Sequence, residues 1–328
     1  MLKDTFGRTI TYLRISVTDR CNFRCVYCMP PEGVTWQPHE TMLRYEEIAE
    51  IVKVAAENGI TDIRLTGGEP LIRGDICKLV AMIRAIPQIK DISLTTNGLL
   101  LEKYAQELKQ AGLTRVNISL DTLDAEKFSR LTRGGSFEKT WRGIIAAEAA
   151  GLMPIKLNSV VIRGANDSEI IDLAKLSIEK PWEIRFIELM PVRNQAFWGE
   201  GFLPPEKAYV SVKEMQQMLS SLNLVEETRK NGNGPAHSFR IPGAVGTIGF
   251  ISPIGEKFCK DCNRLRLTSD GNLRPCLLSD KEVPLREAIR EGKDILPLLH
   301  EAILIKPEGH HLEDQVSPSG RCMMQIGG

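Results

Sequence analysis

The chain has 328 residues, 42% of them hydrophobic, and its 42 lysines and arginines balance its 42 aspartates and glutamates. The length predicts about two domains, and the composition excludes a disordered polyelectrolyte and a nucleic-acid-binding protein that relies on bulk positive charge. Charges interrupt every apolar stretch before the length of a membrane span, and residues 1–5 lack the apolar core of a signal peptide. We therefore expect a cytoplasmic protein.

Short apolar runs alternate with amphipathic segments through the first two thirds of the chain. Glycines follow three of the predicted helices, at Gly59, Gly112 and Gly151, as expected of C-terminal caps. The pattern predicts βα units around a parallel sheet, with fewer strands than a closed barrel has, and hence an α/β fold with an open or partial barrel. The predicted strands are residues 13–17, 62–66, 91–95, 115–119, 155–161 and 184–188, and the predicted helices are 45–58, 75–85, 101–110, 138–150 and 167–177.

The pattern changes from Pro191 onwards. Residues 204–205 and 230–235 carry proline, glycine and asparagine, which are loop signals. We predict a barrel domain over residues 1–222 and a smaller C-terminal α+β region over 223–328. The predicted elements here are helices at 211–222, 285–291 and 295–303 and short strands near 238–240 and 246–251.

Three cysteines, Cys21, Cys25 and Cys28, directly follow the first predicted strand, where an α/β barrel places its chemistry. Without a secretory signal, clustered thiols suggest a metal site rather than disulfides. A four-iron cluster held by three cysteines leaves one iron open. A structural zinc site is the alternative, although zinc sites typically show two Cys-x2-Cys pairs.

A second cysteine group, Cys259, Cys262 and Cys276, lies in the C-terminal region. Cys322 is a candidate fourth ligand that would complete a zinc site here. The eighth cysteine, Cys77, lies on the apolar stripe of the helix predicted at 75–85, so we interpret it as a buried structural thiol.

Two arginines follow this second group. Residues 263–267 alternate, and the period of a strand places Arg264 and Arg266 on one face. A structural zinc site gains nothing from two guanidinium groups, whereas an anionic substrate does. We therefore predict a second three-cysteine cluster that exposes one iron to an anionic substrate.

Cationic side chains interrupt the predicted barrel strands, although parallel strands covered by helices are typically apolar. Arg14, Arg64, Lys156 and Arg185 lie on four different strands. One such residue can reach solvent or pair with an acid, but several unpaired buried cations would be very costly. Because the chain has no net charge, this local basicity predicts a small polyanion, such as a nucleoside triphosphate, inside the barrel.

The first cysteine group resembles the radical S-adenosylmethionine (SAM) superfamily, because its spacing is Cys-x3-Cys-x2-Cys and Tyr27 precedes the third cysteine. Residues 66–70, Thr-Gly-Gly-Glu-Pro, match the segment that holds the SAM amino group there. The resemblance implies a four-iron cluster whose open iron binds SAM and, once reduced, releases a 5′-deoxyadenosyl radical. The SAM-contacting positions that it implies are Tyr27, Gly68, Ser119 and Met190, where core filling is an equal alternative for Met190.

With all signatures in order, residues 6–328 resemble the GTP 3′,8-cyclase family, the molybdenum cofactor biosynthesis protein A family. The resemblance implies a partial (βα)6 barrel, two [4Fe-4S] clusters, SAM and the conversion of GTP to (8S)-3′,8-cyclo-7,8-dihydroguanosine 5′-triphosphate, the first step of molybdopterin synthesis. It also implies an electron donor, delivery of the product to cyclic pyranopterin monophosphate synthase, and a homodimer. The GTP-contacting positions that it implies are Arg14, Arg64, Thr95, Lys156, Arg185, Arg264 and Arg266.

The chain ends in two glycines, Gly327 and Gly328. A frayed terminus is one interpretation, and a conjugation handle of the kind found in small carrier proteins is another. The family resemblance implies a third, in which the tail threads into the barrel and acts with Arg264 and Arg266 to position the reacting groups.

Two other functions stay open at this point. One is another radical SAM enzyme with an auxiliary cluster, for example in peptide maturation, although the arginine pair and the buried cations favour a nucleotide. The other is a zinc or iron–sulfur binding protein without turnover. GTP-dependent formation of 5′-deoxyadenosine separates the three.

Overall fold

A parallel sheet forms the centre of the molecule, as predicted. The computed structural model describes residues 1–190, 198–227, 234–256, 258–310, 312 and 320–327. The six predicted strands are present within two residues of their expected bounds and pair in chain order, each parallel to the next. These strands are β1 (Tyr12–Ser16), β2 (Asp62–Thr66), β3 (Asp91–Thr96), β4 (Arg115–Ser119), β5 (Lys156–Val161) and β6 (Glu183–Glu188).

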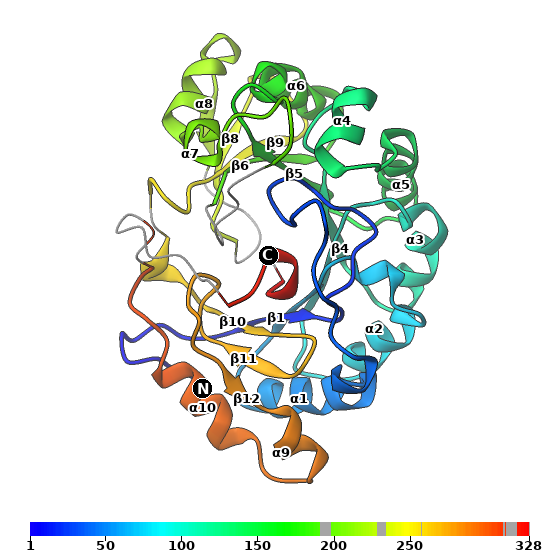
Figure 1. Cartoon of the computed structure of the whole chain (residues 1–328), viewed down its shortest axis with the longest axis vertical. Helices are drawn as coiled ribbons and strands as arrows, with labels where there is room; N and C mark the ends of the chain where they lie inside the picture. Colours follow the sequence, from blue (N-terminus) through cyan, green and yellow to red (C-terminus); the bar gives the residue numbers. More distant parts are fainter. Residues whose placement is uncertain (191–197, 228–233, 257, 311, 313–319, 328) are drawn as a thin grey trace.

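Helices cover the outer face of this sheet (Figure 1). The first helix buries Ile48, Ile51 and Val52 against it, and the helix gives way to the next strand at Gly59, whose φ of +113° favours glycine. The helices are α1 (Tyr45–Glu57), α2 (Ile76–Arg84), α3 (Leu101–Gln110), α4 (Ala125–Thr132), α5 (Phe137–Ala149) and α6 (Ile170–Glu179).

Helix α4 was not among the predicted helices. It has only 8 residues, and its N-terminus is fixed by Asp124, whose Oδ1 accepts hydrogen bonds from the amides of Glu126 and Lys127, both at 2.9 Å. A helix this short depends on its cap and on tertiary packing more than on a long apolar period, so the sequence pattern gave little signal.

The C-terminal region extends the same sheet at both sides. β9 (Thr247–Ile251) pairs parallel with β6, and β10 (Arg264–Leu267) pairs parallel with β1. The strand order is β12-β11-β10-β1-β2-β3-β4-β5-β6-β9-β8-β7, in which the outer strands are antiparallel. These outer strands are β7 (Val225–Glu227), β8 (His237–Arg240), β11 (Asn272–Arg274) and β12 (Val283–Pro284).

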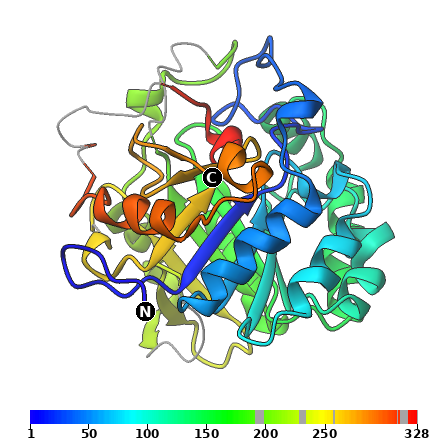
Figure 2. The same ribbon diagram turned by 90° about the horizontal axis from the view of Figure 1, so that it is seen from below.

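Four further α-helices belong to the described part of the chain after β6. The predicted helix at 211–222 is divided into α8 and a 3-10 turn, Ser220–Leu222. Figure 2 shows α9 and α10 beside α1, on the outer side of the sheet. The four helices are α7 (Pro205–Ala208), α8 (Val212–Met218), α9 (Arg286–Arg290) and α10 (Leu296–Leu304).

The two faces of each barrel strand differ in polarity. Leu13 and Ile15 pack into the apolar layer beneath the helices, whereas Arg14 and Ser16 point to the opposite, concave side. The same alternation in the neighbouring strands gives the barrel an apolar outer layer and a polar interior. No helix in the described ranges is both long and apolar enough to cross a lipid bilayer.

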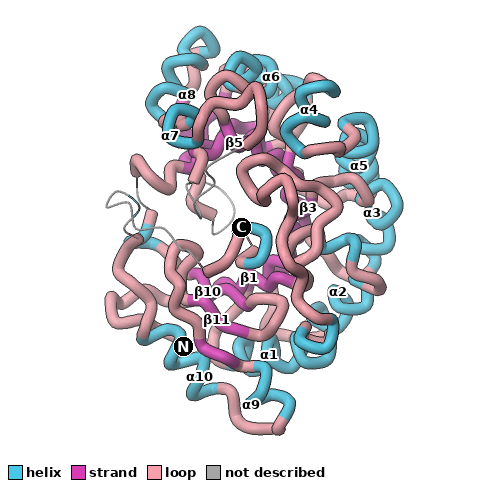
Figure 3. Tube along the Cα trace, viewed as in Figure 1, coloured by secondary structure: helices cyan, strands magenta, loops and turns pink. Residues whose placement is uncertain are grey.

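Loops at one end of the barrel surround the C-terminal segment (Figure 3). Residues 322–327 lie inside the barrel mouth, where Ile326 is 1% exposed. The frayed-terminus interpretation is therefore wrong for the described part of the tail. Gly328 lies outside the described residues.

Candidate functional site

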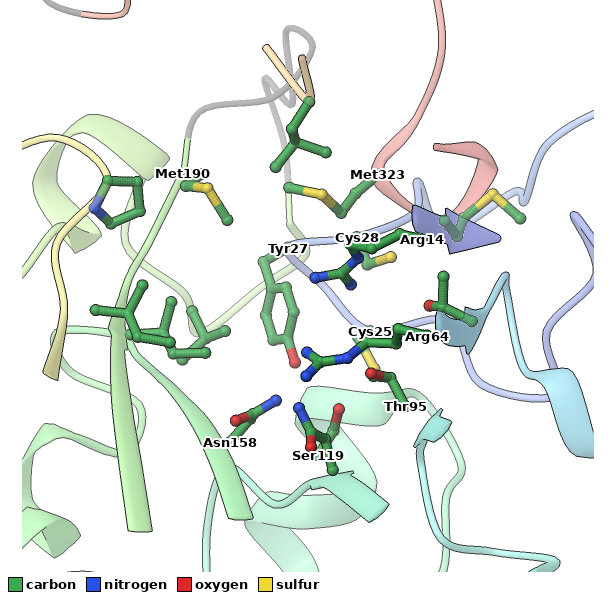
Figure 4. A pocket seen from close by; sticks show the side chains of 18 of the residues that line it. Arg14, Cys25, Tyr27, Cys28, Arg64, Thr95, Ser119, Asn158, Met190 and Met323 are labelled. Carbon is green, nitrogen blue, oxygen red and sulfur yellow. The ribbon is translucent and has the colours of Figure 1, made fainter. Parts of the chain in front are cut away.

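Both cysteine groups face one cavity of about 300 Å³, a size at which proteins bind small molecules. Figure 4 shows the guanidinium groups of Arg14 and Arg64 pointing into it beside Tyr27 and Cys25. Lys156 and Gly327 are not among the lining residues. The predicted site residues that do line it are Arg14, Cys21, Cys25, Tyr27, Cys28, Arg64, Gly68, Thr95, Ser119, Arg185, Met190, Cys259, Cys262, Arg264, Arg266 and Cys276.

The first triplet, Cys21, Cys25 and Cys28, lies on the loop after β1. The amide of Cys28 donates to the carbonyl oxygen of Cys25 at 2.9 Å, and the amide of Phe23 donates to Cys21 Sγ at 3.4 Å. Arg133 ties the loop to the barrel, because its Nη1 donates to the carbonyls of Arg24 (2.9 Å) and Met29 (2.7 Å). The loop is thus held by bonds that leave its sulfur atoms facing the cavity.

Burial dominates the electrostatics of this triplet. It raises the pKa of Cys21 to about 11 and holds the pKa values of Cys25 and Cys28 well above their usual range. The thiols are neutral in the free protein, so binding a cluster would require them to lose protons.

Tyr27 is held by Asp121, a residue that sequence reasoning missed. The Tyr27 hydroxyl donates to Asp121 Oδ2 at 2.7 Å, and Oδ1 of Asp121 accepts from the amide of Val160 at 2.9 Å. Burial raises the pKa of Asp121 to about 6. Its signal in the sequence was its place two residues beyond β4, at the strand end where barrels carry functional groups.

Gly68 lies where the loop after β2 touches the first-triplet loop. Its amide donates to the carbonyl of Thr18 at 2.8 Å, and an added Cβ would lie 2.0 Å from the carbonyl oxygen of Arg20. The neighbouring Glu69, which lies in the segment matched to SAM binding but was given no role of its own, accepts from the Thr96 hydroxyl and the Asn97 amide, both at 2.7 Å. Burial raises the pKa of Glu69 to about 7.

The second triplet, Cys259, Cys262 and Cys276, lies beside cations. Although burial opposes ionisation, Arg264 and Lys306 lower the pKa of Cys262 to about 7. The Lys306 ammonium donates to Cys262 Sγ at 3.5 Å. The positive charge of Arg264 and Lys306 favours the thiolate form of Cys262, which is the form that binds a metal cluster.

Cys322 is not beside the second triplet, so the alternative in which it completes a zinc site there is wrong. It packs with Met29 and Met324 against Cys21 and Cys28 of the first triplet. Cys77 is 6% exposed within the apolar core, as predicted. Across the described ranges, no three His, Cys, Asp or Glu side chains are arranged to hold a single metal ion; a four-iron cluster instead places each thiolate on a different iron.

Two of the four predicted barrel cations are paired, which corrects the premise that they would lack partners. Glu183 accepts from Lys156 Nζ at 2.7 Å and from Arg185 Nε at 2.6 Å. Burial opposes the ionisation of Glu183, but the two cations outweigh it and lower its pKa to about 2. Glu183 lies two residues before Arg185 on β6, so this alternation was a signal that sequence reasoning missed.

A row of arginines crosses three adjacent strands instead. In the sheet register, Arg14 lies between Arg266 on β10 and Arg64 on β2. Arg64 Nε donates to Ser93 Oγ at 3.2 Å, and its guanidinium lies 5.5 Å from the ring centre of Tyr12. Burial lowers the pKa of Arg14 and of Arg64 to about 9 and that of Arg266 to about 10. Burying three adjacent guanidinium groups costs free energy, and a bound polyanion would offset that cost by neutralising their charge.

The tail contacts this row. Arg266 Nη1 donates to the carbonyl oxygens of Ile326 at 3.2 Å and Gly327 at 2.5 Å. Gly327 has a φ of +66°, and an added Cβ would lie 2.7 Å from Thr66 Cγ2. Arg321 anchors the tail through Asp270 and Glu282, at 2.8 and 2.7 Å.

Two amide side chains facing the interior have polar atoms without a hydrogen-bond partner among the described residues. These atoms are the oxygen and the nitrogen of the buried Asn117 amide and Oδ1 of Asn158. Both residues line the cavity. In the register of β4 and β5, Asn117 lies beside Lys156 and Asn158 lies beside Ser119. Buried polar atoms are rarely left unsatisfied, so these amides fit a site completed by a ligand.

Comparisons with known proteins agree with this geometry. Residues 15–177 match the family described as "Radical SAM superfamily", and residues 182–312 match "Molybdenum Cofactor Synthesis C". The chain is 49% identical to GTP 3′,8-cyclase of Pelotomaculum thermopropionicum over 332 residues and 48% identical to that of Moorella thermoacetica over 330 residues. Each alignment covers 100% of both chains.

Among solved structures, Streptococcus suis SuiB bound to S-adenosylmethionine has a similar fold. The TM-score is 0.60 at 16% sequence identity, and the match covers 90% of this chain and 68% of SuiB. At this identity the likeness concerns the fold alone. Together with the family match over residues 15–177, it confirms the predicted radical SAM architecture.

Proposed function

The chain belongs to the GTP 3′,8-cyclase family of radical SAM enzymes, and on this premise we propose how its residues divide the work. It is a GTP 3′,8-cyclase of molybdenum cofactor biosynthesis, and it uses SAM and [4Fe-4S] clusters. One observation supports the assignment of its residues: two cysteine triplets and a row of buried arginines face a single cavity.

We assign Cys21, Cys25 and Cys28 to the cluster that binds SAM, and Cys259, Cys262 and Cys276 to a second cluster. When bound, the clusters and SAM supply the one-electron chemistry that starts the cyclisation. The protein positions the reactants and excludes water. Tyr27, Gly68, Ser119 and Met190 are our proposed contacts to SAM; Tyr27 is fixed by its hydrogen bond to Asp121.

GTP would lie between the two triplets. Arg14, Arg64 and Arg266 offer adjacent guanidinium groups there, which suit a triphosphate. Thr95, Arg185 and Arg264 line the same cavity. Lys156 lies behind this lining with Glu183, so it would act at longer range unless GTP binding draws its ammonium away from that carboxylate.

The tail would position the reacting groups. Gly327 already lies against Thr66 and Arg266, next to the proposed SAM and GTP sites. Glycine fits this narrow place because its φ is positive and no side chain could be accommodated without displacing Thr66. We extend the same role to Gly328.

Several further features stay proposals that rest on the family resemblance. We propose a cytoplasmic homodimer that takes electrons from a separate donor and passes its product to cyclic pyranopterin monophosphate synthase. We also propose a boundary near residue 222 between the barrel and the C-terminal region, which share one sheet.

The test is anaerobic reconstitution followed by incubation with SAM, a reductant and GTP. We expect about eight irons per chain, GTP-dependent 5′-deoxyadenosine and a product with the mass of cyclised GTP. SAM cleavage that does not depend on GTP would instead favour another radical SAM reaction, such as peptide maturation. Stoichiometric zinc without visible absorption would contradict the cluster assignment.

A further inference from the structure

A buried lysine outside every predicted motif touches the second triplet. Lys306 lies just beyond α10 and is only 3% exposed. We propose that Lys306 is a positioning residue for the second cluster: its ammonium joins the two chain segments that carry the three thiolates and raises the reduction potential of the cluster they hold. This inference rests on the proposed assignment of Cys259, Cys262 and Cys276 to a cluster.

The contacts of Lys306 use all the hydrogens of its ammonium group. Nζ donates to Cys262 Sγ at 3.5 Å, to the carbonyl of Arg264 at 2.8 Å and to the carbonyl of Pro275 at 2.6 Å. A lysine has three N–H donors, so three acceptors satisfy it. The donor set is complete without any contact to solvent.

These acceptors belong to the two segments that bear the ligands. Cys262 is itself a proposed ligand, Arg264 follows it by two residues, and Pro275 directly precedes Cys276. One ammonium therefore links the segment before β10, which carries Cys262, to the segment after β11, which carries Cys276, at the open end of this antiparallel strand pair. Hydrogen-bonding groups behind metal ligands orient those ligands and tune the metal in this way.

The charge of Lys306 has no carboxylate partner in the part of the chain that the structure describes. Its three partners are a sulfur and two carbonyl oxygens, and none of the ion pairs between described side chains includes it. Burying such a cation is costly unless an anion lies close. Three thiolates that hold a cluster supply that negative charge.

The ammonium should also favour electron uptake by the cluster. Reduction adds negative charge, and the potentials of iron–sulfur clusters depend on net charge and on hydrogen bonds to their sulfurs. A cation that donates to a ligand sulfur stabilises the reduced form. Removing it should therefore shift the midpoint potential to a more negative value.

The test isolates the second cluster in full-length protein whose first triplet is replaced by alanine, Cys21→Ala, Cys25→Ala and Cys28→Ala. In this parent, Lys306→Met removes the charge and the three donors while keeping an unbranched side chain, and Lys306→Arg keeps the charge. Lys293→Met is the matched control, because Lys293 is exposed and pairs with Glu291 at the surface. The readouts are the midpoint potential from redox titration followed by electron paramagnetic resonance, and the rate of iron loss to a chelator.

We expect Lys306→Met to lower the midpoint potential and to lose iron about ten times faster or more, whereas Lys306→Arg retains most of the wild-type potential and Lys293→Met matches the parent. Complete cluster loss in Lys306→Met with retention in Lys306→Arg also supports the proposal. An unchanged potential and iron-loss rate in Lys306→Met overturns it, as does equal loss in both variants. A parent without iron would overturn the cluster assignment, and this inference with it.

Discussion

The two cysteine triplets have the same number of ligands and face the same cavity, but the protein surrounds them differently. Cations from elsewhere in the chain tie down each loop: Arg133 donates to carbonyls of the first loop, whereas Lys306 and Arg8 donate to carbonyls of the segments that carry the second triplet. Lys306 also donates to a ligand sulfur, Cys262 Sγ. The first triplet lies where burial raises thiol pKa values, whereas Arg264 and Lys306 lower the pKa of Cys262 in the second.

This difference matches the proposed partners of the two sites. SAM carries a positively charged sulfonium, and the guanidinium groups that lie beside the first triplet, those of Arg14 and Arg64, are ones that we assign to GTP. GTP brings several negative charges, and the arginines that would meet them lie on the side of the second triplet and on β1 and β2. Two sets of three cysteines can therefore take different roles, SAM binding at one and GTP binding at the other, because the charges around them differ.

The largest expected effect comes from removing one ligand of either triplet. Cys25→Ala should abolish SAM cleavage, with or without GTP, because the cluster that would bind SAM is lost. Cys262→Ala should abolish the cyclised product but leave some SAM cleavage, because only GTP placement is lost. Anaerobic assays that quantify 5′-deoxyadenosine and product by mass spectrometry check both.

Cys77→Ala is the control for this pair, since Cys77 is buried in the core away from the cavity lining. We expect it to keep both products. If Cys25→Ala and Cys262→Ala lost SAM cleavage to the same extent, the proposed division between the triplets would be wrong.

The next effect concerns the tail, which reaches from the first triplet to the arginine row. Deleting residues 327–328 should abolish cyclised product while iron content and GTP affinity stay near wild type, because Arg266 only exchanges its bonds to the tail carbonyls for other partners. Gly327→Ala should reproduce part of this loss, since a Cβ there would meet Thr66 Cγ2. Product and 5′-deoxyadenosine are measured together.

A truncated protein that forms product at the full-length rate would leave the tail without a catalytic role. Replacing Ser220 by alanine, in an exposed 3-10 turn far along the chain from the tail, serves as the control and should change neither quantity.

The sequence predicted the barrel and both triplets because their signals are local. Apolar alternation marks each strand. The Cys-x3-Cys-x2-Cys motif of the first triplet spans only eight residues, and the arginine pair follows Cys262 of the second triplet within four residues. The pairing of Arg185 with Glu183 lies within β6 and was overlooked there. The pairing of Lys156 with Glu183 was missed because it joins neighbouring strands whose register becomes known only in the folded sheet. Lys306 was missed for the same reason: its contacts lie 31 to 44 residues away in the chain.

The third expected effect is a loss of GTP affinity when the arginine row is broken. Arg266→Ala should weaken GTP binding about ten- to a hundredfold, because charge-assisted hydrogen bonds contribute about 1.5–3 kcal/mol each. Iron content should stay unchanged. Arg142→Ala, at an exposed ion pair with Glu102, is the control. Wild-type affinity in Arg266→Ala and also in single alanine variants of Arg264, Lys156 and Arg185 would contradict the role of these cations.

The smallest expected effect is a pH dependence of GTP affinity that arises from Lys156 on β5. Burial and the neighbouring Arg185 lower the pKa of Lys156 to about 7, against an ordinary value of 10.5. Below that pH the ammonium is charged; above it the neutral amine predominates, so binding a polyanion must draw a proton back onto Lys156. GTP affinity should therefore fall as pH rises from 7.5 to 9, by at most about tenfold per pH unit.

Lys156→Arg should remove this slope, because a guanidinium stays charged throughout the range. Calorimetric titration of GTP in buffers with different ionisation enthalpies measures the proton uptake directly, and we expect uptake by the wild type but not by Lys156→Arg. Lys180→Arg, at the half-exposed pair with Glu148, controls for the substitution itself and should keep the wild-type slope. Equal slopes and equal proton uptake in Lys156→Arg and wild type would show that the charge at this position does not respond to GTP. The proposed triphosphate site would then consist of the arginine row on the side of the second triplet, without Lys156.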